Sequence, residues 1–304
     1  MNPGEQPSRK SQPLVELECL DELWFQVSGT LCNLSCTHCF ISCNPKNDSF
    51  GFLDLETVRG YLTESRALGV KEYYFTGGEP FLNRDMLPML EETLQLGPAS
   101  VLTNGTSLRE NTIADLRRIA LRSSYSLEIR VSIDGYDAAM NDPLRGKGTF
   151  AAAMRGVDQL VAAGFLPIIT MVQTWPDERT LEVFTHFSGE LRRRGYSRPR
   201  IKILPTLKIG MEESRTHGYL PEERITAEMM EEFDPNDLLC SHSRIVTDRG
   251  VAVCPILIEA PGAHLGKSLA DSLQPFPVVH SACYTCYLHG TICANTGATL
   301  GTDR

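Results

Sequence analysis

The segment from residue 23 to residue 204 alternates between strand-like and helix-like patterns, which limits the fold more than any other feature of the sequence. Six strand-like segments, rich in β-branched or aromatic residues, cover residues 23–28, 72–75, 100–103, 127–133, 166–173 and 200–204. Five helix-like segments between them cover residues 54–68, 84–96, 108–121, 149–163 and 177–194. Such alternation is typical of parallel strands covered by helices, so it predicts an α/β fold.

Residues at the ends of the helix-like segments agree with this pattern. Asp54 is a good N-cap, and Gly69 and Gly164 fall where helices would end. Six strands are too few for a closed eight-stranded barrel, which leaves an open, curved (β/α)6 arrangement or a doubly wound sheet. In both folds the ligand site lies at the C-terminal ends of the strands, so we expect it in the loops after the first four.

Ten cysteines form two groups at opposite ends of the chain. The first group is Cys19, Cys32, Cys36, Cys39 and Cys43, and the second is Cys240, Cys254, Cys283, Cys286 and Cys293. In a reducing compartment, closely spaced cysteines more often bind metals or do redox chemistry than form disulfides. The distribution therefore predicts two separate sites.

Charge and hydropathy argue against several classes of partner. The formal net charge of −9 disfavours a nucleic acid, whose phosphates favour basic surfaces, and suits a cationic substrate, although many proteins are acidic for solubility alone. The longest apolar runs are too short to cross a bilayer, and residues 1–13 lack the apolar centre of a signal peptide. We expect a cytoplasmic protein with no membrane partner and with residues 1–18 as a flexible leader.

A C-x3-C-x2-C loop follows the first strand and consists of Cys32, Cys36 and Cys39 with the residues between them. Three thiolates on one loop can hold three corners of a cubic four-iron cluster and leave the fourth iron open to a ligand. A structural zinc ion is the alternative, with His38 or Cys43 as its fourth ligand. We interpret Cys43, and likewise Cys19, as free, partly buried thiols.

This loop and its surroundings resemble the radical SAM superfamily. The resemblance rests on the cysteine spacing after a strand, on the adjacent aromatic Phe40, and on the motif Gly77-Gly78-Glu79-Pro80 one βα unit later. It implies a partial (β/α)6 barrel with a [4Fe–4S] cluster, which binds S-adenosylmethionine (SAM) and cleaves it reductively to a 5′-deoxyadenosyl radical. A flavodoxin or ferredoxin is the kind of partner that would supply the electron.

The resemblance also implies which residues bind SAM. They are Phe40, Gly77, Gly78, Glu79, Pro80, Asn104, Ser132, Asp134 and Arg145. The two glycines would let the backbone approach the methionine part, Glu79 would accept from its ammonium group, and Arg145 would pair with its carboxylate. Without the resemblance, the glycines form a turn that closes a strand, and Arg145 is a surface charge.

The second cysteine group resembles the auxiliary-cluster extensions of radical SAM enzymes, called SPASM and Twitch. The full SPASM pattern needs more than the five cysteines present, so the shorter Twitch form with a second [4Fe–4S] cluster fits better. The expected ligands are Cys240, Cys254, Cys283 and Cys286. Zinc remains the alternative, since two cysteine pairs also describe a zinc ribbon. The chain thus divides into a leader (1–18), a barrel (19–235) and an auxiliary-cluster domain (236–304).

Cys293 is the spare cysteine of the second group. We interpret it as a hydrogen-atom donor to a carbon radical, with a structural thiol or an alternative cluster ligand as the other possibility. The chain then resembles aminoglycoside-modifying radical SAM epimerases and dehydrogenases. This predicts hydrogen abstraction from a carbinol carbon of a cationic, aminoglycoside-type sugar, followed by epimerisation. The alternatives are two-electron oxidation of such a sugar, radical maturation of a ribosomal peptide, and a zinc-stabilised binding module that is not an enzyme.

Overall fold

A nine-stranded sheet organises the part of the chain that the computed structural model describes, which is residues 12–290 and residue 292. The strands, in chain order, are β2 (Glu22–Gln26), β3 (Glu72–Thr76), β4 (Ala99–Thr103), β5 (Leu127–Ser132), β6 (Ile168–Val172), β7 (Arg200–Leu204), β8 (Ser243–Thr247), β9 (Gly250–Ala252) and β10 (His264–Gly266). Their order across the sheet is β10-β9-β8-β2-β3-β4-β5-β6-β7. Strands β2 to β7 are parallel neighbours in sequence order, and the sheet does not close, which confirms the predicted open α/β arrangement.

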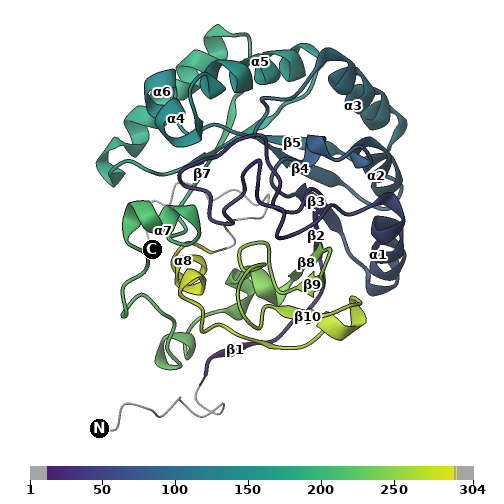
Figure 1. The fold of residues 1–304 in the computed structure, drawn as a ribbon, viewed down its shortest axis with the longest axis vertical. Helices are drawn as coiled ribbons and strands as arrows, with labels where there is room; N and C mark the ends of the chain where they lie inside the picture. The colour runs from purple at the N-terminus through teal and green to yellow at the C-terminus, as the bar shows by residue number, and fades with distance from the viewer. Residues whose placement is uncertain (1–11, 291, 293–304) are drawn as a thin grey trace.

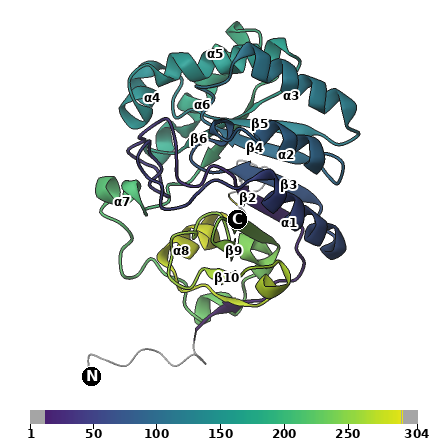
Figure 2. The same ribbon diagram turned by 45° about the vertical axis from the view of Figure 1, so that its right-hand side comes forward.

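The helices are α1 (Leu55–Leu68), α2 (Met86–Thr93), α3 (Glu110–Arg122), α4 (Ala138–Arg145), α5 (Thr149–Ala162), α6 (Thr180–Arg193), α7 (Met211–Thr216) and α8 (Ser281–His289). Short 3₁₀ turns are η2 (Pro80–Leu82), η3 (Asp177–Arg179), η4 (Glu228–Met230), η5 (Pro235–Asp237), η6 (Leu239–Ser241) and η7 (Ala270–Ser272). Helices α1 to α6 form an arc around the outside of the curved sheet (Figures 1 and 2). None of the helices in the described ranges is both long and apolar enough to span a membrane.

The predicted helix ends are confirmed for α1. The Asp54 side chain accepts from the Thr57 N–H at 2.8 Å, and Gly69 ends the helix in the left-handed region with φ of +75°. Helix α4 was not expected from the sequence, because Pro143 within it is a residue that normally interrupts helices.

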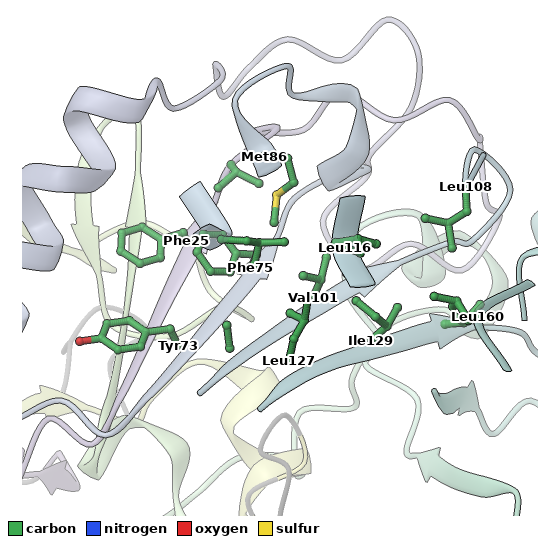
Figure 3. Packing of buried hydrophobic residues seen from close by; sticks show 14 of the residues in the cluster. Phe25, Tyr73, Phe75, Met86, Val101, Leu108, Leu116, Leu127, Ile129 and Leu160 are labelled. Atoms are coloured by element: carbon green, nitrogen blue, oxygen red, sulfur yellow. The ribbon is translucent and has the colours of Figure 1, made fainter. Parts of the chain in front are cut away.

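Alternation along the parallel strands gives the sheet two different faces. One set of side chains, including Phe25, Phe75, Val101 and Ile129, packs against the surrounding helices as the main core (Figure 3). The opposite face carries Trp24 and Tyr74, whose stacked rings have their centroids 4.2 Å apart. On this face the cysteine loop covers the sheet. The interior of the barrel is thus partly filled by the segment that carries the first cysteine group.

The C-terminal third of the chain extends the same sheet. Strand β8 pairs in parallel with β2, and β9 and β10 follow as antiparallel neighbours. A separate two-stranded sheet joins β1 (Leu14–Val15) to β11 (Phe276–Pro277). The predicted leader of residues 1–18 was therefore wrong at its C-terminal end, because the Val15 side chain is buried in the C-terminal hydrophobic cluster.

Candidate functional site

The first cysteine group lies on a closed loop at the C-terminal edge of the parallel strands. Gly29 turns the chain after β2 with φ of +53°, and the Gln26 side chain donates to its carbonyl at 2.8 Å. Leu31 and Asn44 form a parallel bridge, and the Cys32 N–H donates to the Asn44 carbonyl at 3.3 Å. The two ends of the loop are therefore held together next to the end of β2. This is the C-terminal edge of the sheet, where the sequence predicted the ligand site.

The thiols of Cys32, Cys36 and Cys39 lie close enough for each pair to interact electrostatically. Cys32 is buried, and the other two are half-buried. Burial raises the pKa of the Cys32 thiol to about 12 and that of Cys36 to about 11. A metal centre that replaces the protons of these thiols would hold them as thiolates, and three thiols on one short loop are what suits this group to metal binding.

Hydrogen-bond donors surround two of these sulfurs. The Leu34 N–H lies 3.4 Å from Cys32 Sγ, and the Asn104 amide lies 3.7 Å from the same atom. The Cys43 N–H donates to Cys39 Sγ at 3.3 Å. Such bonds stabilise thiolates that ligate an iron–sulfur cluster, so the residues present fit a [4Fe–4S] cluster with three protein ligands.

Cys43 is a buried free thiol, and it is hydrogen-bonded to Cys39. This contact lowers the pKa of Cys39 below its usual range. The contact arises because Ser42, in the left-handed region at φ of +51°, turns the chain back toward the cysteine loop. The prediction of a partly buried thiol was wrong for Cys19, which is exposed because it precedes β2 on the outside of the fold.

Gly77 and Gly78 follow β3 and pack directly against the start of the cysteine loop. A Cβ atom on Gly78 would lie 1.9 Å from the Leu31 carbonyl oxygen, and one on Gly77 would lie 2.3 Å from Ser28 Oγ. The Glu79 N–H donates to the Leu31 carbonyl at 3.1 Å. The glycines are therefore required for docking two loops, and their approach to SAM stays a prediction.

Replacing Gly78 with alanine is expected to destabilise the protein by about 1–3 kcal/mol, because the backbone of Leu31 cannot yield as a flexible side chain would. Gly60→Ala is the matched control. Gly60 lies within α1 with no atom near its missing Cβ, so alanine there should stabilise by about 1 kcal/mol. Urea unfolding of the metal-free proteins measures both changes. Equal unfolding midpoints for the two variants would contradict the docking argument.

Glu79 is fully buried, and protein donors occupy its carboxylate. Its Oε1 accepts from the Thr103 hydroxyl at 2.7 Å and the Phe81 N–H at 3.2 Å, and its Oε2 accepts from the Asn104 N–H at 2.8 Å. The Asn104 side chain in turn donates to Asn33 of the cysteine loop at 2.8 Å. In this arrangement Glu79 holds the loop after β4 against the cysteine loop, and its predicted contact with the SAM ammonium group is not tested.

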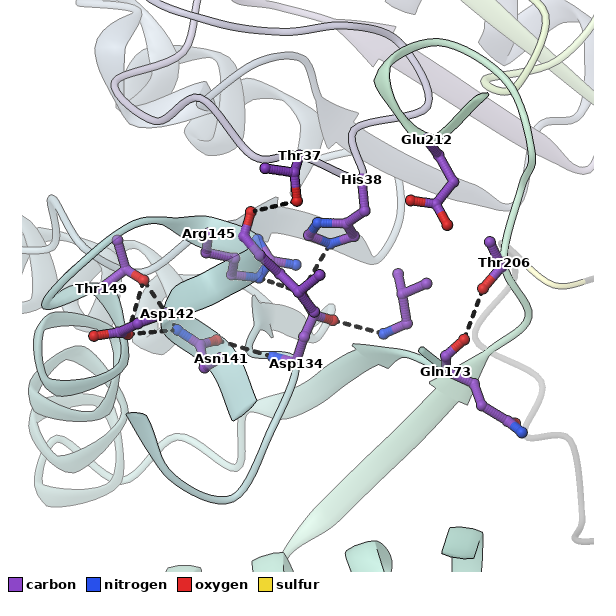
Figure 4. A network of polar contacts seen from close by, with 12 residues as sticks. Thr37, His38, Asp134, Asn141, Asp142, Arg145, Thr149, Gln173, Thr206 and Glu212 are labelled. Atoms are coloured by element: carbon purple, nitrogen blue, oxygen red, sulfur yellow. Dashed lines mark hydrogen bonds and ion pairs between the residues drawn. The ribbon is translucent and has the colours of Figure 1, made fainter. Parts of the chain in front are cut away.

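Asp134, just after β5, is the centre of a buried polar network (Figure 4). His38 Nε2 lies 2.8 Å from its Oδ2, Arg145 Nε bonds the same oxygen, and the Val172 N–H donates to Oδ1 at 2.7 Å. Burial alone would raise the pKa of Asp134, but the Arg145 charge and the His38 hydrogen bond outweigh it and hold that pKa well below its usual range. The carboxylate is therefore ionised and joins β5, the cysteine loop and α4.

Arg145 lies between Asp134 and the cysteine group, because its Nε bonds Asp134 and its charge is near enough to Cys36 to oppose the rise in the pKa of that thiol. Ser132 ends β5 and is half-buried. The sequence reasoning considered His38 only as a zinc ligand and missed its bond to Asp134. Its position before the third cysteine places it in the site, but only the fold reveals which carboxylate it binds.

The four C-terminal cysteines expected as ligands line one small pocket. Cys240 lies on η6, Cys254 follows β9, and Cys283 and Cys286 lie on α8. The other lining residues are apolar: Leu238, Leu239, Val253, Ile256, Leu257, Phe276, Val278 and Ala282. Burial raises the pKa of Cys240 to about 12 and that of Cys254 to about 11. Cys293, the predicted hydrogen-atom donor, lies outside the described residues.

Phe40 connects the surroundings of the two cysteine groups. Its half-buried ring packs against the apolar cluster that contains Cys32 and Cys43 and against the cluster that contains the four C-terminal cysteines. Helix α7 also reaches the loop, where the Met211 N–H donates to the Cys39 carbonyl at 3.0 Å. The two groups therefore lie in adjoining parts of one packed structure.

Comparison with known proteins agrees with this geometry. The GTP 3',8-cyclase of Edwardsiella ictaluri (strain 93-146) is 29% identical over 184 residues, which are 58% of this chain and 53% of the cyclase. The mycofactocin maturase MftC of Mycobacterium ulcerans (strain Agy99) is 32% identical over 135 residues, 44% of this chain and 35% of the maturase. This chain thus spans about half or less of the length of these relatives.

Solved structures share the fold at low sequence identity. Native anSMEcpe with bound AdoMet has a TM-score of 0.60 and 15% identity, over 86% of this chain and 81% of that one. Streptococcus suis SuiB bound to precursor peptide SuiA has a TM-score of 0.64 and 16% identity, over 87% and 66%. The sequence model of the Radical SAM superfamily matches residues 27–186, more than half of the chain, including the cysteine loop, the Gly-Gly turn, Asp134 and Arg145. This protein belongs to the radical SAM superfamily.

Proposed function

We propose that this protein is a radical SAM enzyme with two [4Fe–4S] clusters, which abstracts a hydrogen atom from a small cationic sugar and epimerises the carbon. The observation that carries the two-cluster arrangement is the convergence of Cys240, Cys254, Cys283 and Cys286 on one apolar cavity, in addition to the three-cysteine loop. The acidic net charge supports a cationic substrate.

The three-cysteine loop is proposed to hold the first cluster. With SAM bound, this cluster would supply the electron for a one-electron cleavage to a 5′-deoxyadenosyl radical. The chain's own contribution is rigidity and charge. Glu79 and Asn104 fix the loop after β4 to the cysteine loop, and Asp134 holds the Arg145 guanidinium beside Cys36, where a guanidinium suits the SAM carboxylate. A reduced flavodoxin or ferredoxin is the proposed electron source.

The four C-terminal cysteines are proposed to hold the second cluster. The four thiols stand around a pocket with apolar walls, and this arrangement suits a cubic cluster whose irons each take one thiolate. The iron-rich chemistry proposed for the first site favours iron and sulfide here over the alternative of a single zinc ion.

The relatives bring other substrate classes into consideration. GTP 3',8-cyclase is named for a nucleoside triphosphate, and SuiB was solved with a precursor peptide. A nucleoside triphosphate is strongly anionic, and the acidic balance of this chain disfavours it. A cationic sugar suits that balance, and Cys293 is proposed to return a hydrogen atom to the substrate carbon. The thiyl radical left on Cys293 would take up one electron from the reduced flavodoxin or ferredoxin and one proton from solvent. Oxidation of the same sugar is the alternative reaction.

Turnover in deuterated water separates these reactions. We expect the anaerobically reconstituted enzyme, given SAM, a reductant and a panel of aminoglycosides such as neomycin and kanamycin, to form 5′-deoxyadenosine and an isomeric product. That product should carry a single deuterium at carbon, because a thiol exchanges with solvent before it donates. Mass spectrometry of the product measures this. An unlabelled ketone would instead identify a dehydrogenase, and no aminoglycoside-dependent product would overturn the sugar assignment.

A further inference from the structure

Arg244 on β8 is a completely buried arginine, with none of its side chain exposed to solvent. Its guanidinium donates only to backbone carbonyls. Nε bonds the Ser272 oxygen at 2.9 Å, Nη1 bonds those of Cys240 and Ser243 at 2.7 Å each, and Nη2 bonds that of Gln274 at 3.1 Å. Arginine is almost never fully buried unless it is paired with an anion.

The described residues place no carboxylate in an ion pair with Arg244. Carbonyl oxygens satisfy its hydrogen bonds but do not neutralise its charge, and a buried charge without a counter-charge is costly. An arginine side chain keeps its proton in proteins at neutral pH, so Arg244 is charged. The groups that favour its charged form are the Cys240 and Cys254 thiols.

These two cysteines belong to the cavity that holds the proposed second cluster. Four thiolates around a [4Fe–4S] core carry a net negative charge, because their combined charge exceeds that of the core, and a reduced cluster is more negative still. The guanidinium is linked to this site directly, since its Nη1 bonds the backbone of Cys240. The buried positive charge of Arg244 and the negative charge of the proposed cluster can therefore neutralise each other.

The geometry points to Arg244 as the internal counter-ion of the second cluster, a positioning residue that raises the cluster's reduction potential by stabilising its more negative, reduced state. This inference rests on the proposed function. A buried cation near the cluster favours the form with one more electron by Coulomb attraction in a medium of low dielectric constant. The second cluster is thereby a better electron acceptor than its four thiolates alone would make it.

The test compares Arg244→Gln with Arg244→Lys in the reconstituted holoenzyme. Both variants lose the guanidinium fork, but only glutamine loses the charge. The midpoint potentials of both clusters are measured by redox titration followed by electron paramagnetic resonance. We expect glutamine to weaken electron binding by the second cluster at least tenfold, which is about 59 mV for a one-electron couple, and lysine to cause a clearly smaller shift. The potential of the first cluster is the internal control.

Each outcome bears on one of the two proposals. Iron for only one cluster in the unmutated enzyme overturns the second cluster itself, whatever Arg244 does. With both clusters present, an unchanged potential in Arg244→Gln, or equal shifts in the two variants, overturns the counter-ion. Loss of the second cluster in Arg244→Gln but not in Arg244→Lys supports the counter-ion role. Loss of the second cluster in both variants assigns Arg244 to the hydrogen-bond scaffold and overturns the counter-ion role.

Discussion

Replacing Cys32, Cys36 and Cys39 together with alanine is expected to abolish SAM cleavage and to leave about four of about eight irons per chain. Cleavage requires an iron with an open position, and these three thiols are the proposed protein ligands that create it. The remaining iron should belong to the four cysteines around the C-terminal cavity. Iron and sulfide analysis of anaerobic samples, with chromatography of 5′-deoxyadenosine, measures both effects.

The converse variant, with Cys240, Cys254, Cys283 and Cys286 replaced by alanine, should lose the other half of the iron. Cys19→Ala is the control, because this exposed thiol is not among the proposed cluster ligands and should leave iron and cleavage unchanged. Persistent cleavage in the first triple variant would show that the cluster was assigned to the wrong residues. Zinc without sulfide in the unmutated protein would contradict both clusters.

The parallel strands and their helices could be predicted from local sequence, because each is encoded by its own residues. The last strand of the barrel coincides with its predicted segment at residues 200–204, and Asp54 and Gly69 mark both ends of α1. The pairing of β8 with β2 could not be predicted, since it joins segments far apart in the chain. Helix α4 could not be predicted, because Pro143 within it is a residue that normally interrupts helices. Arg145, a predicted site residue, is the last residue of this helix.

The candidate site divides in the same way. Cysteine spacing is informative without a structure, because the thiols act through their own chemistry and their separation is set by the chain. His38 and Arg244 act through partners that the fold brings to them. Nothing near His38 in the sequence identifies Asp134, and Arg244 reads as an ordinary surface cation until its burial is known.

The Asp134 network makes a prediction about stability that does not depend on any cofactor. Asp134→Asn keeps the shape of the side chain but removes its charge, and it leaves the Arg145 guanidinium without a counter-charge in a buried position. Breaking a buried ion pair in this way costs about 3–5 kcal/mol. Urea unfolding of the metal-free proteins measures the loss. Asp115→Asn, which breaks an exposed pair with Arg118 on α3, is the matched control, and it should cost less than about 1 kcal/mol.

Two further measurements show whether the stability lost in Asp134→Asn comes from the missing charge or from a change in side-chain shape. In the double variant Asp134→Asn/Arg145→Met the second substitution should recover part of the stability, because no unpaired charge remains. The pH dependence has a defined sign, since the pKa of Asp134 is lower in the folded protein than the value of about 3.9 in an unfolded chain. Its contribution is then complete above that unfolded value and is lost as the pH falls through the folded one. The stability gap between the unmutated protein and Asp134→Asn should therefore be constant near neutral pH and narrow in acid, and a gap that widened in acid would exclude an ionised Asp134.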